Sequence, residues 1–546
     1  MNTTALPAPE AVLTTPGASL LGPKGWTALL ACTLAIVVGV PVLNLVVPSD
    51  SAFHLSEFYV SLLGKIMCYA ICALAIDLIW GYTGILSLGH GLFFALGGYA
   101  MGMYLMRQIG LDGNYKSELP DFMVFLDWKA LPWHWSVSDS FIAQMLLVVL
   151  VPGTLAFVFG WFAFRSRIKG VYFSIITQAL TFAAMLLFFR NETGFGGNNG
   201  FTDFKRILDL PLGTPAMRVL LCVLTGLVLI GFFLMARAIV LSKYGRVLQA
   251  IRDAETRVMF TGYNPVAYKL SIWTLSAVMC GVAGALYVPQ VGIINPGEMS
   301  PAASIEMAIW AAVGGRATLI GPIVGAFFVN GAKSWFTVAF PEYWLFFRNE
   351  TGFGGNNGFT DFKRILGMPL STPGMRVFLC SLSGVVLIAL YVMARWLVRG
   401  KFGRVLQAIR DAESRVMFTG YEPLAYKLTV WTLSAMMCAL AGALYVPQVG
   451  IINPSEMSPA ASIEMAIWAA VGGRASLIGP IIGAFFVNGA KSWFTVAFPE
   501  YWLYFLGTLF IVVTLFLPDG LVGLWRRLRR VRTPAGAAGA GGDSTP

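Results

Sequence analysis

The chain has little charge. Asp, Glu, Lys and Arg make up only 12% of its 546 residues, whereas about 25% is usual in soluble domains, so the composition argues against a soluble globular enzyme. A disordered chain is excluded as well, because 57% of the residues are hydrophobic and 14% are aromatic. These features indicate a polytopic membrane protein.

Side chains that commonly build reactive sites are also scarce. The seven cysteines all lie inside apolar runs, which is not the setting of a disulfide framework or a zinc site. The three histidines form no recognisable arrangement with a nucleophile or with other metal ligands. The stretch Gly331-Ala332-Lys333-Ser334 lacks the glycine that an ATP-binding P-loop has before its lysine. We therefore expect a protein that is not an enzyme and has no catalytic residue, metal or cofactor of its own.

Lysine and arginine cluster between the apolar runs, and the formal net charge is +11. The basic clusters lie at 165–169, 243–269, 395–427 and 526–532, and acidic residues favour 50–57 and 112–127. Because basic short loops mark the cytoplasmic side of a membrane protein, we place these clusters and both termini inside. Positive charge is also typical of nucleic-acid surfaces. Here the clusters alternate with apolar runs as topology signals do, so we expect no nucleic-acid partner.

Long apolar runs recur along the whole chain. About 20 mainly apolar residues cross the hydrocarbon core as a helix. The first run exceeds a signal-peptide core and has no cleavage site after it, so we interpret it as a retained anchor. The short run at 301–315 is flanked by Pro301 and by Gly314-Gly315, which is typical of a re-entrant or broken helix. Outside the second copy described below, the runs lie near 27–48, 57–80, 91–107, 139–164, 170–189, 216–241, 269–291, 301–315, 317–340 and 502–519.

One segment occurs twice in the sequence. Residues 188–345 and 346–503 are identical at all but 28 of 158 aligned positions, and 17 of the differences fall between 209 and 244. Four runs in each copy bring the total to about 14 transmembrane or broken helices in an all-α membrane protein, against about 10 with a single copy. Because each copy crosses the membrane an even number of times, the second copy can follow the first without inverting the membrane orientation of the segments after it. We divide the chain into a cytoplasmic tail (1–26), an N-terminal membrane module (27–187), the two copies (188–345 and 346–503) and a closing span with a basic tail (504–546).

Each copy contains one polar loop with a distinct pattern. After Gly245, which we expect to break the incoming helix, apolar residues recur at helical spacing at Val247, Ala250, Ile251 and Ala254. The pattern predicts a short amphipathic helix that ends near Gly262. This segment has two possible interpretations. It is either an ordinary basic surface loop or a docking helix whose apolar stripe enters a groove of a cytoplasmic partner. The candidate residues are Gly245, Arg246, Ala250, Arg252, Asp253, Glu255 and Gly262, with Gly403, Arg404, Ala408, Arg410, Asp411, Glu413 and Gly420 in the second copy.

This loop resembles the coupling loop of the permeases of ATP-binding cassette (ABC) importers, in their branched-chain amino acid and urea/amide branch. Further stretches resemble the same branch, namely WGYTGILSLGHG at 80–91 and SIEMAIWAAVGGR at 304–316. The stretches GFGGNNGFTDF at 194–204, KSWFT at 333–337 and FPEYWL at 340–345 are most similar to the urea-type permease that pairs with a second permease.

The resemblance implies a multi-pass permease subunit of the bacterial inner membrane that imports urea or short-chain amides. It also implies four kinds of contact, with a second permease subunit, two cytoplasmic ATPase subunits that use ATP, a periplasmic binding protein and the bilayer. A branched-chain amino acid permease of the same architecture is one alternative. An ion-coupled secondary transporter and a non-transporting relic of the duplication are two others.

The second copy departs from the family pattern, which has a single coupling loop. We expect only one of the two loops to dock, and the segment from Arg404 to Lys427 is the candidate, because only that copy runs directly into the closing span.

A few polar residues lie inside or beside the apolar runs. Asp77, Glu306 and Glu464 are ionisable groups within spans, where such groups usually face a cavity or a partner. A group that reaches the interface is the alternative. Thr83, Ser87 and His90 lie in or beside a glycine-rich stretch and are candidates for polar contacts along the translocation path. For His90, a hydrogen-bonded structural role is an equal alternative, and the nearby glycines are expected to allow close helix packing.

Overall fold

The computed structural model describes residues 20–166, 170–339, 359–360, 362, 364–365, 368–370, 372–473 and 476–497. These residues fall into two compact units, and the boundary between them in the sequence follows Ser334, inside the helix α11 (Ile320–Ala339). Helices make up most of both units, and the strands among the described residues are two-residue pairs. The prediction of an all-α polytopic membrane protein is therefore confirmed.

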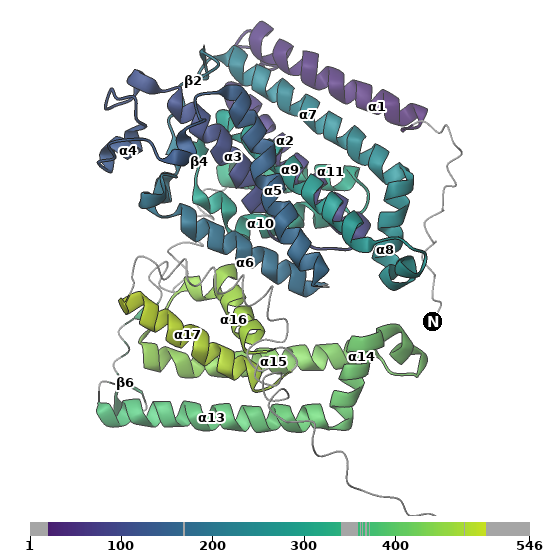
Figure 1. The fold of residues 1–546 in the computed structure, drawn as a ribbon, viewed down its shortest axis with the longest axis vertical. Helices are drawn as coiled ribbons and strands as arrows, with labels where there is room; N and C mark the ends of the chain where they lie inside the picture. Colours follow the sequence, from purple (N-terminus) through teal and green to yellow (C-terminus); the bar gives the residue numbers. More distant parts are fainter. Residues whose placement is uncertain are drawn as a thin grey trace, which may run out of the picture. The chain divides into compact units, whose positions relative to one another are not determined.

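The first unit is a bundle of long helices (Figure 1). Its helices are α1 (Pro23–Leu34), α2 (Glu57–Thr83), α3 (His90–Arg107), α4 (Asp121–Phe125), α5 (Phe141–Arg165), α6 (Val171–Phe188), α7 (Pro215–Leu241), α8 (Lys243–Phe260), α9 (Pro265–Val291), α10 (Pro301–Gly314) and α11 (Ile320–Ala339). Short helical turns are η1 (Ala35–Gly39), η2 (Val42–Val46), η3 (Gly110–Asp112), η4 (Trp133–Trp135), η5 (Asn191–Thr193), η6 (Gly197–Asn199) and η7 (Pro296–Met299). The strand β1 (Phe201–Thr202) pairs with β4 (Ile293–Ile294), and β2 (Arg206–Ile207) pairs with β3 (Leu210–Pro211).

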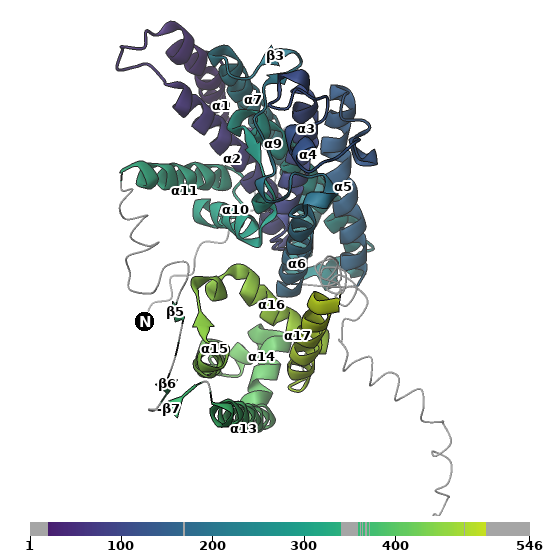
Figure 2. The ribbon, with the colours of Figure 1, turned by 90° about the vertical axis from the view of Figure 1, so that its left-hand side faces the viewer.

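The core of this unit forms where α2, α3, α5 and α9 pack together. Figures 1 and 2 both show α9 running beside α2 and α3. The α3–α9 contact depends on glycine: a Cβ atom at Gly97 would lie 1.9 Å from the carbonyl oxygen of Gly281, and one at Gly284 would lie 1.8 Å from that of Phe94. The expectation that glycines such as Gly97 allow close helix packing is confirmed. In lipid the hydrophobic effect does not drive helices together, so membrane helices associate through the van der Waals contacts that such close backbone approach allows.

Every predicted run in the described residues corresponds to a helix. Among the residues that the structure describes, seven helical stretches are long and apolar enough to cross a membrane, at 23–46, 57–83, 141–165, 215–241, 265–291, 373–399 and 423–449. The remaining runs form shorter or less apolar helices, among them α10 with 14 residues. The closing span at 502–519 and the chain termini lie outside the described residues.

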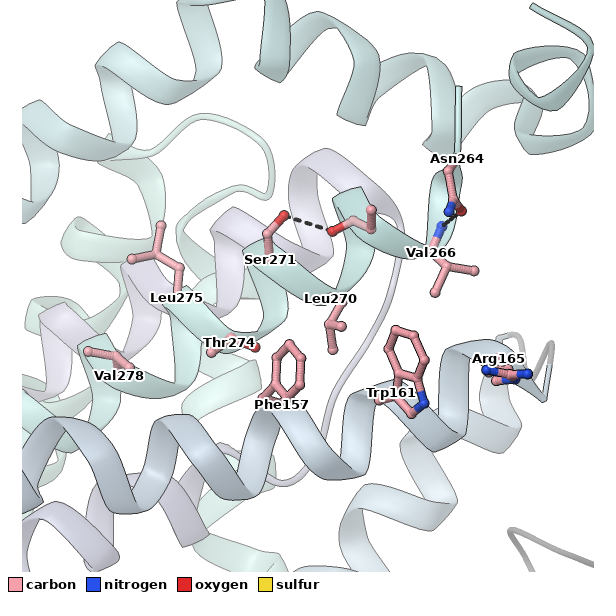
Figure 3. Close-up of a pocket in the computed structure, with 11 residues that line it drawn as sticks. Phe157, Trp161, Arg165, Asn264, Val266, Leu270, Ser271, Thr274, Leu275 and Val278 are labelled. Carbon is pink, nitrogen blue, oxygen red and sulfur yellow. Dashed lines mark hydrogen bonds between the residues drawn. The ribbon is translucent and has the colours of Figure 1, made fainter. Parts of the chain in front are cut away.

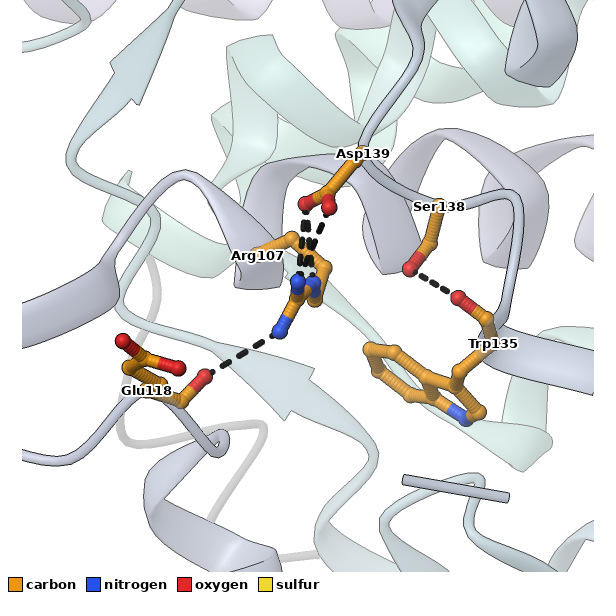
Figure 4. A network of polar contacts seen from close by, with 5 residues as sticks. All are labelled: Arg107, Glu118, Trp135, Ser138 and Asp139. Carbon is orange, nitrogen blue, oxygen red and sulfur yellow. Dashed lines mark hydrogen bonds and ion pairs between the residues drawn. The ribbon is translucent and has the colours of Figure 1, made fainter. Parts of the chain in front are cut away.

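The predicted outer ends of the helices are joined by a polar network (Figure 4). Arg107 at the end of α3 donates two hydrogen bonds of 3.0 Å to the carboxylate of Asp139 and one of 3.2 Å to the backbone carbonyl of Glu118. Trp135 is buried, and its Nε1–H donates to the carbonyl of Gly194 at 3.2 Å. The bonds of Arg107 close the 107–140 connection on itself, and the bond of Trp135 ties it to the loop that begins the first copy.

The second unit contains the helices of the second copy. They are α13 (Pro373–Arg399), α14 (Lys401–Phe418), α15 (Pro423–Val449), α16 (Pro459–Gly472) and α17 (Gly479–Ala497), with the short turn η9 (Pro454–Met457). The strand β5 (Phe359–Thr360) pairs with β8 (Ile451–Ile452), and β6 (Arg364–Ile365) pairs with β7 (Met368–Pro369).

The helices α9 and α15 have nearly the same sequence but very different surroundings. Trp273 in α9 is fully buried, whereas its counterpart Trp431 in α15 is 70% exposed. The reason is that α2, α3 and α5, which cover α9, come from the N-terminal module, and this module occurs only once in the sequence.

Candidate functional site

The predicted amphipathic helix is present as α8. The chain leaves α7 at Ser242, whose hydroxyl caps α8 by accepting a hydrogen bond from the backbone N–H of Gly245 at 3.3 Å. The break therefore lies at Ser242, and the expectation that Gly245 interrupts the incoming helix is wrong. Gly245 is instead buried inside α8, where a Cβ would lie 2.3 Å from the carbonyl oxygen of Val240. The helix bends at Ala254, and Gly262 follows its end with a left-handed φ of 85°.

The buried face of α8 is made of Gly245, Leu248, Ile251 and Val258. The predicted stripe is only partly right, because Ile251 is buried but Ala250 is exposed. The helix begins two residues before Gly245, so its inner face follows the spacing 245, 248 and 251. The basic and acidic candidates Arg246, Arg252 and Asp253 lie on the exposed side, and Phe260 at the end of the helix is 92% exposed.

Arg252 connects α8 to the end of α2. Its Nη1–H donates a 2.9 Å hydrogen bond to the backbone carbonyl of Gly81, and its Nε–H donates at 2.8 Å to Asp253. Gly84, which ends α2 in the left-handed region at φ 74°, lies against the Arg252 side chain. A hydrogen bond from a charged donor contributes about 1.5–3 kcal/mol, so this is a firm link between two elements far apart in sequence.

Two further contacts hold α8 to the start of α9. Lys269 and Glu255 form an ion pair of 2.6 Å, with side chains that are only 10% and 20% exposed. The hydroxyl of Tyr244 donates to the backbone carbonyl of Tyr268 at 3.2 Å, and burial raises the pKa of this phenol. The helix α8 is therefore attached to the bundle through both α2 and α9.

Asp77 organises the turn between α10 and α11. Its buried carboxylate accepts hydrogen bonds from the backbone N–H groups of Ala317 at 2.6 Å and Leu319 at 3.1 Å. The hydroxyl of Tyr82 donates to the carbonyl of Ala317 at 3.0 Å. Ala317 and Leu319 have φ of 64° and 60°, a region that costs a residue with a Cβ about 1–2 kcal/mol. The predicted pathway residue Asp77 thus holds a strained turn next to Gly81.

Arg252, Gly81, Asp77 and the turn at 315–319 therefore form one connected group, which we call the coupling junction. A Cβ at Gly81 would lie 2.5 Å from Asp77 Oδ1 and 2.8 Å from the backbone nitrogen of Ala317. The junction joins α8 to α10 through the end of α2. A short path of hydrogen bonds therefore connects α8, the end of α2 and the turn that follows α10.

The second copy repeats α8 as α14 without the same surroundings. Lys427 and Glu413 keep their ion pair at 2.5 Å, and Arg410 pairs with Asp411 at 2.9 Å. Arg404 and Ala408 are exposed, Gly403 is buried, and Gly420 has a φ of 82° like its counterpart. The helix α2, which supplies Gly81 and Asp77, occurs once in the sequence and lies in the first unit.

The polar residues near the start of α3 make local contacts. His90 is fully buried, its Nε2 lies 3.1 Å from the hydroxyl of Ser276, and its ring packs edge-on against Trp273. This geometry supports the structural alternative for His90. Thr83 donates to the carbonyl of Ile79 in its own helix at 2.5 Å, and buried Ser87 accepts from the N–H of Gly89 at 3.3 Å.

The two glutamates predicted in spans form ion pairs with lysines. Glu306 pairs with Lys333 at 2.9 Å, and Glu464 pairs with Lys491 at 3.0 Å in the second unit. The side chains of Glu306 and Glu464 are 35% and 29% exposed. Within the first unit, Asp77, His90 and Glu306 contact different partners and do not converge on one point.

Sequence reasoning missed a cluster of aromatic rings in the first unit. The ring of Tyr69 lies 4.7 Å from that of Trp310 and 5.7 Å from that of Tyr287, and Tyr287 lies 5.1 Å from Phe94. The hydroxyl of Tyr287 donates to Glu298 in η7 at 3.3 Å. The rings come from α2, α3, α9 and α10, so periodicity within one helix carries no signal of the cluster.

A cavity of about 820 Å³ lies between α5 and α9 (Figure 3). It is lined mainly by apolar side chains such as Phe157, Trp161, Leu270 and Val278, with Arg165 and Asn264 at one end. Phe157 and Trp161 are 49% and 41% exposed. An almost wholly apolar lining offers a polar solute few hydrogen bonds, so this cavity suits hydrocarbon rather than a urea-sized ligand.

The sequence model of one family, described as "Branched-chain amino acid transport system / permease component", matches residues 58–349 and again 343–514. The two matches together cover most of the chain, and each contains one of the two loops that resemble coupling loops.

Three curated relatives illustrate the similarity. The "High-affinity branched-chain amino acid transport system permease protein LivM" of Salmonella typhimurium is 25% identical over 297 residues, which are 50% of this chain and 62% of that protein. LivM of Escherichia coli is 24% identical over 298 residues, with the same shares of the two chains. The "Autoinducer 2 import system permease protein LsrC" of Photorhabdus laumondii is 27% identical over 172 residues, 30% of this chain and 51% of that protein.

This chain therefore spans less than two thirds of the length of these relatives. No solved structure matches it. The relatives are permeases rather than enzymes, and with the span-length helices they place this chain in the inner membrane as a multi-pass protein. The chain belongs to the family of branched-chain amino acid transport system permease components.

Proposed function

We propose that the chain is the membrane permease subunit of an ABC importer and that its solute is urea or a short-chain amide. The observation that carries the proposal is the coupling junction, in which Arg252 of α8 bonds to Gly81 beside the turn held by Asp77. A helix attached in this way passes an external push into the bundle. The choice of solute is supported by the stretches at 194–204 and 333–345, which resemble urea-type permeases.

The partners follow from the same proposal. Two cytoplasmic ATPase subunits bind and hydrolyse ATP, a second permease completes the pathway, and a periplasmic protein delivers the solute. On α8, Phe260 is 92% exposed and Met259 is 48% exposed. An aromatic side chain left in water at the end of a basic helix suits insertion into an apolar groove of an ATPase. The chain's own residues bind and transmit, and the ATPases do the bond chemistry.

The proposed mechanism is mechanical. Closure of the ATPases pushes α8, whose ion pair to Lys269 and hydrogen bond to Gly81 carry the displacement into α9 and α2. The turn at 315–319 moves with the end of α2 because Asp77 and Tyr82 hold it. The displacement of α10 against the rest of the bundle then exchanges access between the two sides of the membrane.

We assign the docking role to α8 and not to the segment from Arg404 to Lys427 that the sequence favoured. The reason is that α8 shares a unit with α2, which supplies Gly81 and Asp77. The test is co-purification of the ATPase subunits with charge-reversal variants at matched positions. Arg246→Glu should abolish co-purification and Arg404→Glu should preserve it. The reverse result returns the role to the second copy.

A branched-chain amino acid is the second candidate solute, because the relatives named LivM are described as branched-chain amino acid permeases. The deciding experiment is uptake of radiolabelled urea and radiolabelled leucine in a strain that lacks its own permease. The proposal expects saturable urea uptake that requires the ATPase subunits and persists when the proton gradient is collapsed. Uptake of leucine alone would establish the second candidate and refute the first.

A further inference from the structure

In the aromatic cluster, Tyr69 lies near the middle of α2 and Tyr287 lies near the end of α9. Tyr69 is the thirteenth residue of the 27-residue helix α2, so it lies about 18 Å from one end of the helix and about 21 Å from the other at 1.5 Å per residue. The neighbouring rings are Phe94 of α3, Tyr287 of α9 and Trp310 of α10. The helix α10 has only 14 residues and follows the turn η7 after α9. Solute sites in many transporters lie near the midplane beside such interrupted helices.

One strong donor in this cluster has no acceptor. Trp310 is 2% exposed, and its Nε1–H is buried without a hydrogen-bond partner. Leaving such a group unsatisfied costs about 1–3 kcal/mol, which a purely structural ring could avoid, since phenylalanine packs without a polar group. The indole N–H of Trp310, whose ring contacts that of Tyr69, is therefore available to donate a hydrogen bond to a ligand.

The same cluster contains a hydrogen-bond acceptor, the Glu298 carboxylate, with lysine side chains nearby. Glu298 accepts from the hydroxyl of Tyr287 at 3.3 Å. Burial raises the pKa of its carboxyl group above the ordinary value, and the positive charges of Lys65 and Lys333 oppose this effect. The Lys65 ammonium also lies 5.8 Å from the centre of the Tyr69 ring. A carboxylate has lone pairs for several donors, so Glu298 can accept from Tyr287 and from a ligand together.

The cluster is connected to the coupling junction through α10. Four residues after Trp310, α10 ends at Gly314 and enters the turn that Asp77 holds. Tyr69 and Trp310 belong to the two helices, α2 and α10, that the junction joins.

We propose that the Tyr69–Trp310–Tyr287 rings and Glu298 form the solute-recognition site and that its ligand is a planar, uncharged amide such as urea. The amide enters flat between the rings of Tyr69 and Trp310 when they separate. Its carbonyl oxygen accepts from the Trp310 Nε1–H, and its N–H groups donate to the Glu298 carboxylate. This inference rests on the proposed function and assigns residues to it.

The second copy supplies a matched control for every residue that it shares. Tyr445, Glu456 and Trp468 repeat Tyr287, Glu298 and Trp310, and the Nε1–H of Trp468 is buried without a partner as well. The N-terminal module is not repeated, so Tyr69 and Phe94 have no counterparts, and Tyr445 is 43% exposed. The second copy therefore has the donor and the acceptor but lacks two of the four rings.

The experiment measures radiolabelled urea uptake by the full chain, expressed with its ATPase, permease and binding-protein subunits. The variants are Trp310→Phe and Glu298→Leu, and the controls are Trp468→Phe and Glu456→Leu. Each lost hydrogen bond of about 1 kcal/mol raises the KM for urea about fivefold. We expect that increase for the two variants and none for the two controls, with equal amounts of each chain in the membrane and equal co-purification of the ATPases.

Several results would overturn the assignment. If wild-type chain imports urea and both variants keep its KM, the site is elsewhere, although the proposed function stands. If Trp468→Phe raises the KM as much as Trp310→Phe, the rings of the first unit are not the determinant. If wild-type chain imports leucine but no urea, both the proposed solute and the amide class of this ligand are refuted. Should Trp310→Phe fail to accumulate in the membrane, Glu298→Leu, which changes none of the four rings, decides the question.

Discussion

Replacing Gly284 with alanine should open the contact between α3 and α9, whereas the same change at Gly442 should be harmless. A Cβ at Gly284 would lie 1.8 Å from the carbonyl oxygen of Phe94 and 3.0 Å from the backbone nitrogen of Gly98. Backbone atoms cannot rotate away, so the helices must separate by about 1.5 Å to restore van der Waals contact. At Gly442 nothing lies within 4 Å of the added atom.

The size of the effect follows from that separation. Overpacking a core typically costs about 1–3 kcal/mol, and the tight approach of Gly97 to Gly281 is lost at the same time. We therefore expect Gly284→Ala to destabilise the α3–α9 contact by about 3 kcal/mol, which is roughly a hundredfold change in the opening equilibrium. Alanine is a better helix former than glycine by about 1 kcal/mol, so Gly442→Ala should leave α15 as stable as before or slightly more stable.

Native cysteines report on the change. Cys280 is buried in α9, and its counterpart Cys438 in α15 is exposed. Maleimide labelling of the purified chain, quantified by peptide mass spectrometry, should label Cys438 in wild-type protein but spare Cys280. Gly284→Ala should accelerate labelling of Cys280, and Gly442→Ala should leave both rates unchanged. Unchanged protection of Cys280 in Gly284→Ala would refute the reasoning about backbone approach.

Three further predictions concern the coupling junction and the loops. Asp77→Asn removes the carboxylate that accepts hydrogen bonds from Ala317 and Leu319, at a cost of about 2 kcal/mol. The variant should therefore be cleaved faster by trypsin after Arg316. An unchanged cleavage rate contradicts the role assigned to Asp77. Arg252→Ala should reduce solute uptake while ATPase co-purification persists, and the matched variant Arg410→Ala should change neither quantity. If both variants reduce uptake equally, the hydrogen bond from Arg252 to Gly81 does not matter. Burial lowers the pKa of His134 below its ordinary 6.5, so the packing of its ring on Phe195 is fully stable above pH 6.5 and weakens as the pH falls below it. The hydrogen-exchange protection factors of residues 191–200, which are corrected for the pH dependence of intrinsic exchange, should therefore be lower at pH 5.5 than at pH 7.5 in wild-type protein and the same at both in His134→Gln.

Local sequence patterns were sufficient to predict the helices and the presence of α8, although the expected break at Gly245 lies three residues after the true one at Ser242. The cap at Ser242 and the left-handed Gly262 act within a few residues, so the sequence around them determines both ends of α8. The inner face was harder to assign, because Ala250 and Ile251 are adjacent and only the packing against the bundle decides which one is buried.

Contacts between distant segments were not predictable in the same way. The partner of Asp77 is a backbone N–H 240 residues away, and a backbone group leaves no mark in the sequence. The aromatic cluster draws one ring from each of four helices, and each of these rings is ordinary in an apolar span. Trp273 and Trp431 have nearly identical sequence neighbourhoods but opposite burial, so residue identity alone does not determine the environment.

The acceptor that Arg252 finds on α2 belongs to the main chain, and this has an evolutionary consequence. Mutation at position 81 leaves a carbonyl in place whatever residue appears there, although bulk is prohibited because a Cβ would meet Asp77 and Ala317. Position 252 follows another rule, since only a long side chain with a donor reaches that carbonyl. A saturation library selected for growth on the imported solute should therefore enrich small residues at one position and cationic ones at the other, with no compensating pairs between them.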